Sequence, residues 1–113
     1  MTKEERQEFK KNLSNKFTST ESFFQLLGDS TRIKIIALLL KAPNCQMKVE
    51  DITKEIYLSR PAVSHHLIAL KDAGILKLHE ESRYNYYQLV PNDIWNELCD
   101  LFHDISNLTK EYD

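Results

Sequence analysis

Apolar residues recur at helical spacing along most of the chain, and only two glycines and three prolines interrupt the pattern. A spacing of three to four residues is typical of an amphipathic helix, so we expect a largely helical protein. The pattern predicts helices over residues 3–16, over a short stretch ending before Gly28, and over residues 30–41, 49–56, 60–73 and 91–113.

Helix start and stop signals support these bounds. Asp29 and Ser59 are placed to cap the helices that follow them. Pro61 falls in the first turn of a predicted helix, where backbone N–H groups have no acceptor within the helix, so the missing N–H of proline costs no hydrogen bond. Gly74 is a typical helix end.

Two strand-like runs, LKLHE and RYNYYQL, follow that helix and are joined by a polar turn near residues 81–82 that lacks glycine. A short helix, a tight turn, a second helix and a hairpin form the winged helix-turn-helix arrangement. We therefore expect one mainly α domain with a small β-hairpin, in which residues 48–74 are the helix-turn-helix and residues 76–89 the wing.

The apolar residues of the inner helices indicate which sides face the core. Over residues 30–41 we expect Ile33, Ile36, Leu39 and Leu40 to face inward, and over 49–56 we expect Val49, Ile52 and Ile56 to do so.

The first and last helices carry a different pattern. The first has a narrow apolar thread spaced by four, at Phe9, Leu13 and Phe17. The last has a coiled-coil-like seam, widened by Trp95 and Phe102, at Ile94, Leu98, Leu101, Ile105 and Leu108. We expect residues 1–27 and 91–113 to form the interface of a homodimer.

Charge is unevenly distributed although the net value is only −2. Residues 1–29, 30–90 and 91–113 have balances of 0, +3 and −5. A basic middle segment is suited to a polyanion. No apolar run reaches the roughly 18 residues of a membrane span, nothing resembles a signal peptide, and the two cysteines lack a disulfide-framework spacing. We expect a cytoplasmic protein with reduced thiols.

The helix after Ser59 places its two histidines on different sides. Adjacent helical residues diverge by about 100°, so His65 points away from the buried face and His66 lies at the edge of the core. We predict that His65 contacts base edges or phosphates, that His66 packs, and that the two do not chelate one metal ion.

Further residues are predicted DNA contacts because they lie at the exposed start of that helix or at the hairpin tip. The full predicted set is Arg60, Pro61, Ser64, His65, Lys71, Arg83 and Tyr84. Two carboxylates, Glu80 and Glu81, argue against a wing contact because phosphate repels them.

Three stretches resemble one family of regulators. "LLGDSTRIKIIALLL", "LSRPAVSHHLIALKDAGILK" and "ESRYNYYQL" are similar to the opening, the recognition helix and the wing of ArsR-type (arsenical-repressor-like) winged helix regulators. The resemblance runs from about Phe23 to Leu89. It implies a homodimeric repressor on a pseudo-palindromic operator in double-stranded DNA, with the start of the helix after Ser59 in the major groove and release by an inducer that the sequence does not identify.

Metal and redox sensing are alternatives within that family. Lys48 and Glu50 stand where some members have metal-binding thiolates, and Trp95 stands where others have a histidine. Cys99 and His103 share a helix face and are minor metal candidates, and a dithiol switch of Cys45 and Cys99 is a second possibility. We expect no cofactor and favour neither alternative.

Enzymatic function is disfavoured because the chain has no glycine-rich phosphate loop and no nucleophile elbow. A winged helix that binds a protein surface instead of DNA is the other alternative.

Overall fold

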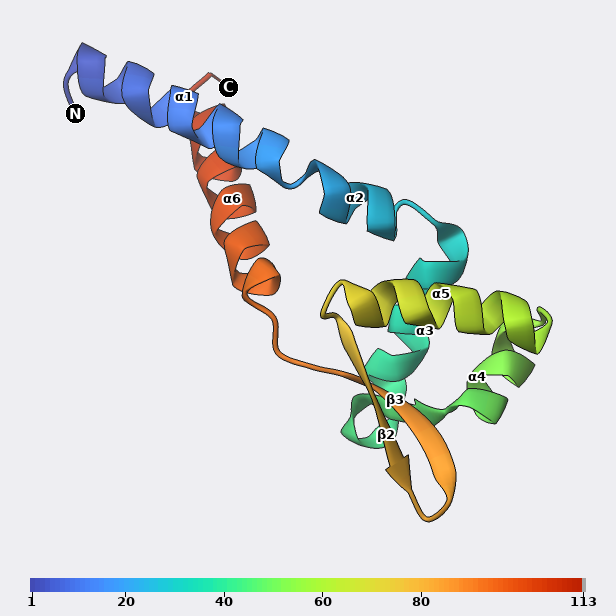
Figure 1. The fold of residues 1–113 in the computed structure, drawn as a ribbon. Coiled ribbons are helices and arrows are strands. Elements are labelled where there is room, and N and C mark those ends of the chain that lie inside the picture. Colours follow the sequence, from blue (N-terminus) through green and yellow to red (C-terminus); the bar gives the residue numbers. More distant parts are fainter. Residues whose placement is uncertain (113) are drawn as a thin grey trace. The chain divides into compact units, whose positions relative to one another are not determined.

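The computed structural model describes residues 1–112. Over this range the elements, in chain order, are α1 (Lys3–Ser19), α2 (Glu21–Leu27), α3 (Ser30–Lys41), the 3-10 turn η1 (Pro43–Cys45), β1 (Gln46–Lys48), α4 (Val49–Ile56), α5 (Arg60–Asp72), β2 (Leu76–Glu81), β3 (Tyr84–Leu89) and α6 (Asp93–Lys110) (Figure 1). They form two compact units, Met1–Phe24 with Asp93–Asp113 and Gln25–Asn92. We call these the helical unit and the winged unit.

The winged unit contains a continuous apolar core. α3 packs against α4, α5 and β3, and α5 packs against β2. Full burial of one aliphatic side chain contributes about 1.5–3 kcal/mol. The side chains with no exposed surface all belong to this unit: Ile35, Leu39, Ile52, Val63, Leu67, Leu70 and Ile75.

The predicted helix signals are confirmed in the winged unit. Asp29 caps α3, because its Oδ1 accepts hydrogen bonds from the backbone N–H groups of Thr31 (2.9 Å) and Arg32 (3.1 Å). Ser59 caps α5 by accepting from the backbone N–H of Ala62 at 3.3 Å. Gly74 has a φ of +78° and ends the segment after α5.

The expected inward face of α3 is partly wrong. Leu39 is fully buried, but Ile33 and Leu40 are 54% and 65% exposed, and Ile35 takes an inward position instead. The run from Ile33 to Leu40 is almost entirely apolar, so its periodicity does not select one face; the packing of α3 against α4, α5 and β3 does.

The sheet has three antiparallel strands in the order β1-β3-β2, one more than the predicted hairpin. β2 pairs with β3 in the register Leu78↔Tyr87, and β1 adds to the other edge of β3 with Met47↔Tyr87. Three residues are too few for an alternating pattern to indicate a strand. The pairing also joins segments about 40 residues apart, which local sequence does not encode.

The hairpin turn contains no glycine, as expected, and its conformation is strained. Ser82 and Arg83 have φ values of +50° and +72°. Two-residue hairpins favour positive φ at both central positions because that twist matches the strands, and Asn-Gly is the usual solution. The chain therefore places an arginine at the wing tip where glycine would be less strained.

The helical unit is built from α1 and α6, which pack against each other within the chain. Phe23 meets Trp95 edge-on at 5.6 Å between ring centroids, and Phe24 lies 6.2 Å from Phe102. Arg6 forms an ion pair with Glu111. Aromatic residues at the start of α2 thus cover part of α6, whereas the predicted homodimer interface stays a prediction.

No helix within residues 1–112 is long and apolar enough to cross a membrane.

Candidate nucleic-acid interface

The predicted contact residues of α5 lie mainly on its solvent side. Val63, Leu67 and Leu70 face the core with no exposed surface. Of the predicted set, Ser64 is half-buried, and the exposed members are Arg60, Pro61, His65 and Lys71. The helix consequently presents a free face of cationic and polar side chains at the end where recognition helices meet bases.

Arg60 is not free in this structure. Its Nη1 lies 3.4 Å from Oε1 of Glu50 on α4, and both side chains are about half exposed, at 56% and 45%. An ion pair between two solvated side chains contributes little stability, so this guanidinium can exchange Glu50 for another hydrogen-bonding partner. Sequence periodicity gave no sign of this contact, because α4 and α5 meet only in the fold.

The histidine pair divides as predicted. His65 is exposed, and His66 retains 17% of its side-chain exposure. Arg32 Nε lies 3.3 Å from His66 Nδ1. Asp29 Oδ1 lies 3.8 Å from the same Nδ1, too far for a hydrogen bond.

The capping carboxylate of Asp29 belongs to the same network. The hydrogen bond from the Arg32 backbone N–H is the main cause that lowers the pKa of Asp29 below its ordinary 3.8, and the charge of His66 adds to it against the opposing effect of burial. Arg32 also donates from Nη1 to the Leu26 carbonyl at 3.2 Å. His66 therefore helps to hold the start of α3 and is a packing residue, as predicted.

The wing brings its predicted residues to the surface together with a residue that the sequence analysis missed. Arg83 and Tyr84 are exposed at the tip. The Nζ atom of Lys48, on β1, lies 3.8 Å from the centroid of the Tyr84 ring, a cation–π contact. Because β1 was not predicted, no pattern in the sequence placed this lysine beside the wing.

The two wing carboxylates have different surroundings. Both are exposed, and Glu81 in addition accepts a hydrogen bond from Gln46 Nε2 at 3.3 Å and lies 3.6 Å from His79 Nε2. The His79 ring stacks on Tyr86 at 5.7 Å. Glu81 is therefore held by neighbouring side chains, but both carboxylates remain charges at the wing.

The minor metal and redox candidates stay predictions that no geometry supports. Cys99 is exposed on α6, and His103 Nε2 lies 3.1 Å from Asn107 Nδ2. Cys45 is half-buried in the winged unit. Within residues 1–112 no group of three or more His, Cys, Asp or Glu side chains is arranged to hold a metal ion.

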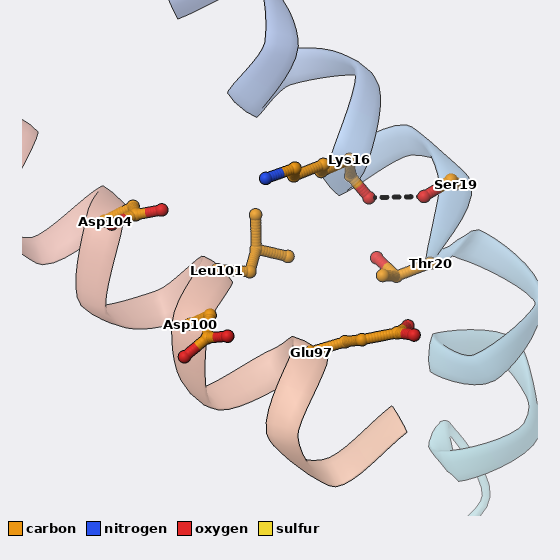
Figure 2. Close-up of a pocket in the computed structure, with 7 residues that line it drawn as sticks. All are labelled: Lys16, Ser19, Thr20, Glu97, Asp100, Leu101 and Asp104. Carbon is orange, nitrogen blue, oxygen red and sulfur yellow. Dashed lines mark hydrogen bonds between the residues drawn. The ribbon is translucent and has the colours of Figure 1, made fainter. Parts of the chain in front are cut away.

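A cavity of about 290 Å³ lies in the helical unit (Figure 2). Lys16, Ser19 and Thr20 line it from the end of α1, and Leu101 and three carboxylates line it from α6. The hydroxyl groups of Ser19 and Thr20 donate to the backbone carbonyls of Lys16 and Phe17. The carboxylates, from Glu97, Asp100 and Asp104, make this cavity unsuitable for a phosphate.

Known proteins resemble this chain in both sequence and fold. The model of a family described as "Bacterial regulatory protein, arsR family" matches residues 29–77. An uncharacterized HTH-type transcriptional regulator of Methanocaldococcus jannaschii is 38% identical over 79 residues, which cover 70% of this chain and 86% of that protein. The transcriptional repressor SdpR of Bacillus subtilis is 36% identical over 66 residues, which cover 58% of this chain and 70% of that protein.

A solved structure extends the similarity to the fold. The crystal structure of the transcriptional regulator HlyU from Vibrio vulnificus superposes with a TM-score of 0.63 at 20% identity, covering 84% of this chain and 95% of that one. At this identity the match supports the architecture alone, and it agrees with the arrangement of helices and hairpin described above.

Proposed function

The chain belongs to the ArsR family of bacterial regulatory proteins, which are transcriptional regulators and not enzymes, and from that premise we propose that it is a sequence-specific DNA-binding repressor released by an inducer. The observation that carries the proposal is the free face of α5. This face presents an exposed cation and an exposed imidazole at the start of a helix whose opposite side is fully buried.

In the proposed complex, the first turns of α5 enter the major groove. Arg60 is suited to guanine O6 and N7, and His65 and Ser64 are suited to base edges or phosphates. Pro61 lies at the same end of the helix. Lys71, at the far end of α5, is suited to a phosphate, which fixes the protein on the duplex without reading sequence.

The wing adds a second contact in this proposal. Arg83 and Tyr84 extend from a hairpin that the β1 strand stiffens on one side. An arginine at such a tip fits a phosphate or a narrow minor groove.

We also propose that the protein acts as a homodimer through residues 1–27 and 91–113. Phe17 and Phe102 are 50% and 49% exposed in the helical unit, although α1 and α6 already pack together. A second copy that covers these rings would present two α5 helices to successive major grooves, about 34 Å apart, and so require a pseudo-palindromic operator.

Binding of the 113-residue chain to DNA tests the proposal. Selection from a pool of random duplexes should enrich one pseudo-palindrome, and affinity for it should fall steeply with salt because phosphate contacts release counterions. Replacing His65 or Arg60 with alanine should cost about 1–3 kcal/mol of affinity for the selected operator.

Lys54→Ala is the matched control, since Lys54 is exposed on α4 and lies outside the proposed contact set. Selection that enriches no sequence, or operator affinity unchanged in both α5 variants, would contradict the proposal.

A further inference from the structure

Two oppositely charged residues flank the first residue of α4, and each contacts a different part of the proposed DNA surface. Val49 between them is buried, with 5% exposure. Lys48 reaches the wing, where its Nζ lies 3.8 Å from the centre of the Tyr84 ring. Glu50 reaches the recognition helix, where its Oε1 lies 3.4 Å from Arg60 Nη1. The buried Val49 thus fixes the backbone from which Lys48 extends to the wing and Glu50 extends to α5.

We propose that Glu50 is a positioning residue that makes Arg60 selective for bases over phosphates, and that Lys48 is a positioning residue that fixes Tyr84 and adds a cation to the wing. This inference rests on the proposed function, because it assigns a role to residues beside Arg60 and Tyr84. Neither residue belongs to the contact set predicted from the sequence.

The argument for Glu50 begins with the freedom of an arginine side chain. An exposed arginine loses considerable rotamer entropy when it is ordered, and an unpaired guanidinium at the start of a recognition helix can bind any phosphate it meets. The Glu50 carboxylate restricts this side chain. It also repels a phosphate that approaches Arg60, because two anions would then share one guanidinium. A guanine edge has no net charge and is not repelled in this way.

Removing the Glu50 charge should therefore affect the two kinds of binding differently. Glu50→Gln keeps the size of the side chain but releases Arg60. Affinity for non-specific DNA should rise about fivefold. Affinity for the operator should stay the same or fall, because the better phosphate contact is balanced by a less ordered base contact. The ratio of specific to non-specific affinity should fall about fivefold or more.

The argument for Lys48 follows from strand register. Lys48 is paired with Tyr86 across the β1–β3 ladder, and Tyr84 is the next residue of β3 on the same side of the sheet. An ammonium group over a tyrosine ring restrains both side chains. It also places a positive charge beside a tip that carries Arg83 and the exposed Glu80. Lys48→Met keeps the aliphatic stem and removes the charge, so it should weaken binding to both kinds of DNA.

The experiment measures binding of the 113-residue chain to two labelled duplexes by fluorescence anisotropy, over a series of salt concentrations. One duplex is the operator obtained by selection, and the other has the same length and composition in scrambled order. Glu50→Gln should lower the affinity ratio as described. Lys48→Met should leave the ratio nearly unchanged and reduce the slope of log K against log salt by about one.

Matched controls separate these effects from net charge. Glu55→Gln removes a negative charge from an exposed position of the same helix and is the control for Glu50→Gln. Lys54→Met removes a positive charge from an exposed position of α4 and is the control for Lys48→Met. If Glu50→Gln and Glu55→Gln change the affinity ratio equally, the role of Glu50 is refuted. If Lys48→Met and Lys54→Met change the salt slope equally, the role of Lys48 is refuted. Thermal unfolding of each variant verifies that the fold is retained.

A double substitution distinguishes failure of this inference from failure of the proposed function. In an Arg60→Ala background, Glu50→Gln should no longer alter the ratio beyond the Glu55→Gln control, because the side chain that it positions is gone. If Arg60→Ala alone weakens operator binding while Glu50→Gln behaves like the control, only the inference fails. If Arg60→Ala leaves operator binding unchanged, the proposed role of Arg60 fails, and the inference about Glu50 fails with it.

Discussion

The two units of the chain differ in how completely they bury their own apolar side chains. Seven side chains of the winged unit have no exposed surface, whereas the most buried apolar residue of the helical unit, Leu101, retains 3%. The helical unit also leaves two phenylalanine rings half exposed. The winged unit therefore has a core of its own, although it also leaves apolar side chains such as Ile33 and Leu40 exposed, at 54% and 65%. The less complete burial in the helical unit supports the proposed homodimer interface but does not by itself require it.

The largest expected effect comes from the core of the winged unit. Leu67→Ala should lower the free energy of unfolding by about 2–5 kcal/mol, because Leu67 has no exposed surface and a cavity would remain in the core. Chemical denaturation monitored by circular dichroism measures the loss. Ile68→Ala is the matched control, since Ile68 is the next residue of α5 and is 47% exposed. Equal losses in the two variants would show that this core does not dominate stability.

The elements of the winged unit could largely be predicted from the sequence because their signals are local. Asp29 and Ser59 act on backbone N–H groups two or three residues away, and these caps lie where they were predicted. The separation of His65 from His66 follows from the angle between adjacent helical residues. Such features need no knowledge of distant segments.

The features that could not be predicted depend on contacts between distant segments. β1 exists because it pairs with β3, about 40 residues later in the chain. The inward face of α3 depends on which side α4 and α5 cover. The partners of Lys48 and Glu50 likewise come from elements whose positions only the fold determines. Both contacts adjoin the candidate site. The exposure of its α5 side chains could therefore be predicted from sequence, but the ion pair and the cation–π contact beside them could not.

The second prediction addresses the helical unit. Phe102→Ser should weaken dimerisation by roughly 30-fold, equivalent to about 2 kcal/mol, because about half of each ring would otherwise be covered by the second copy. Sedimentation equilibrium measures the change. Leu78→Ser serves as the control, since Leu78 is similarly exposed, at 43%, but belongs to the winged unit. An unchanged dimer in Phe102→Ser, or a monomeric wild type, would exclude this face as the interface.

A smaller effect is expected at the capped start of α3. Asp29→Ala should cost about 1 kcal/mol of stability, the usual value of an N-cap, and Asp29→Asn should cost less because its amide oxygen still accepts the hydrogen bonds. The folded-state pKa of Asp29 is lowered, so the stability due to its charge is present above the ordinary value of 3.8 and is lost as the pH falls through the folded value. Denaturation at pH 7 and near pH 3 tests this sign. A difference between wild type and Asp29→Asn that grows on acidification would contradict it.

The smallest expected effect on stability comes from Arg83 at the wing tip, where one substitution should raise stability and weaken DNA binding. Arg83 has a φ of +72°, which glycine adopts without strain, so Arg83→Gly should stabilise the winged unit by up to about 1 kcal/mol. The same change removes a cation from the proposed DNA surface and should weaken binding to all sequences while reducing the salt slope by about one. Ser82→Gly, at the neighbouring turn position with a φ of +50°, should relieve comparable strain without removing a charge. If both glycine variants are more stable and only Arg83→Gly binds DNA less well, the strained arginine serves recognition. If both bind equally well, the Arg83 side chain has no role in binding, and any wing contact depends on its neighbours.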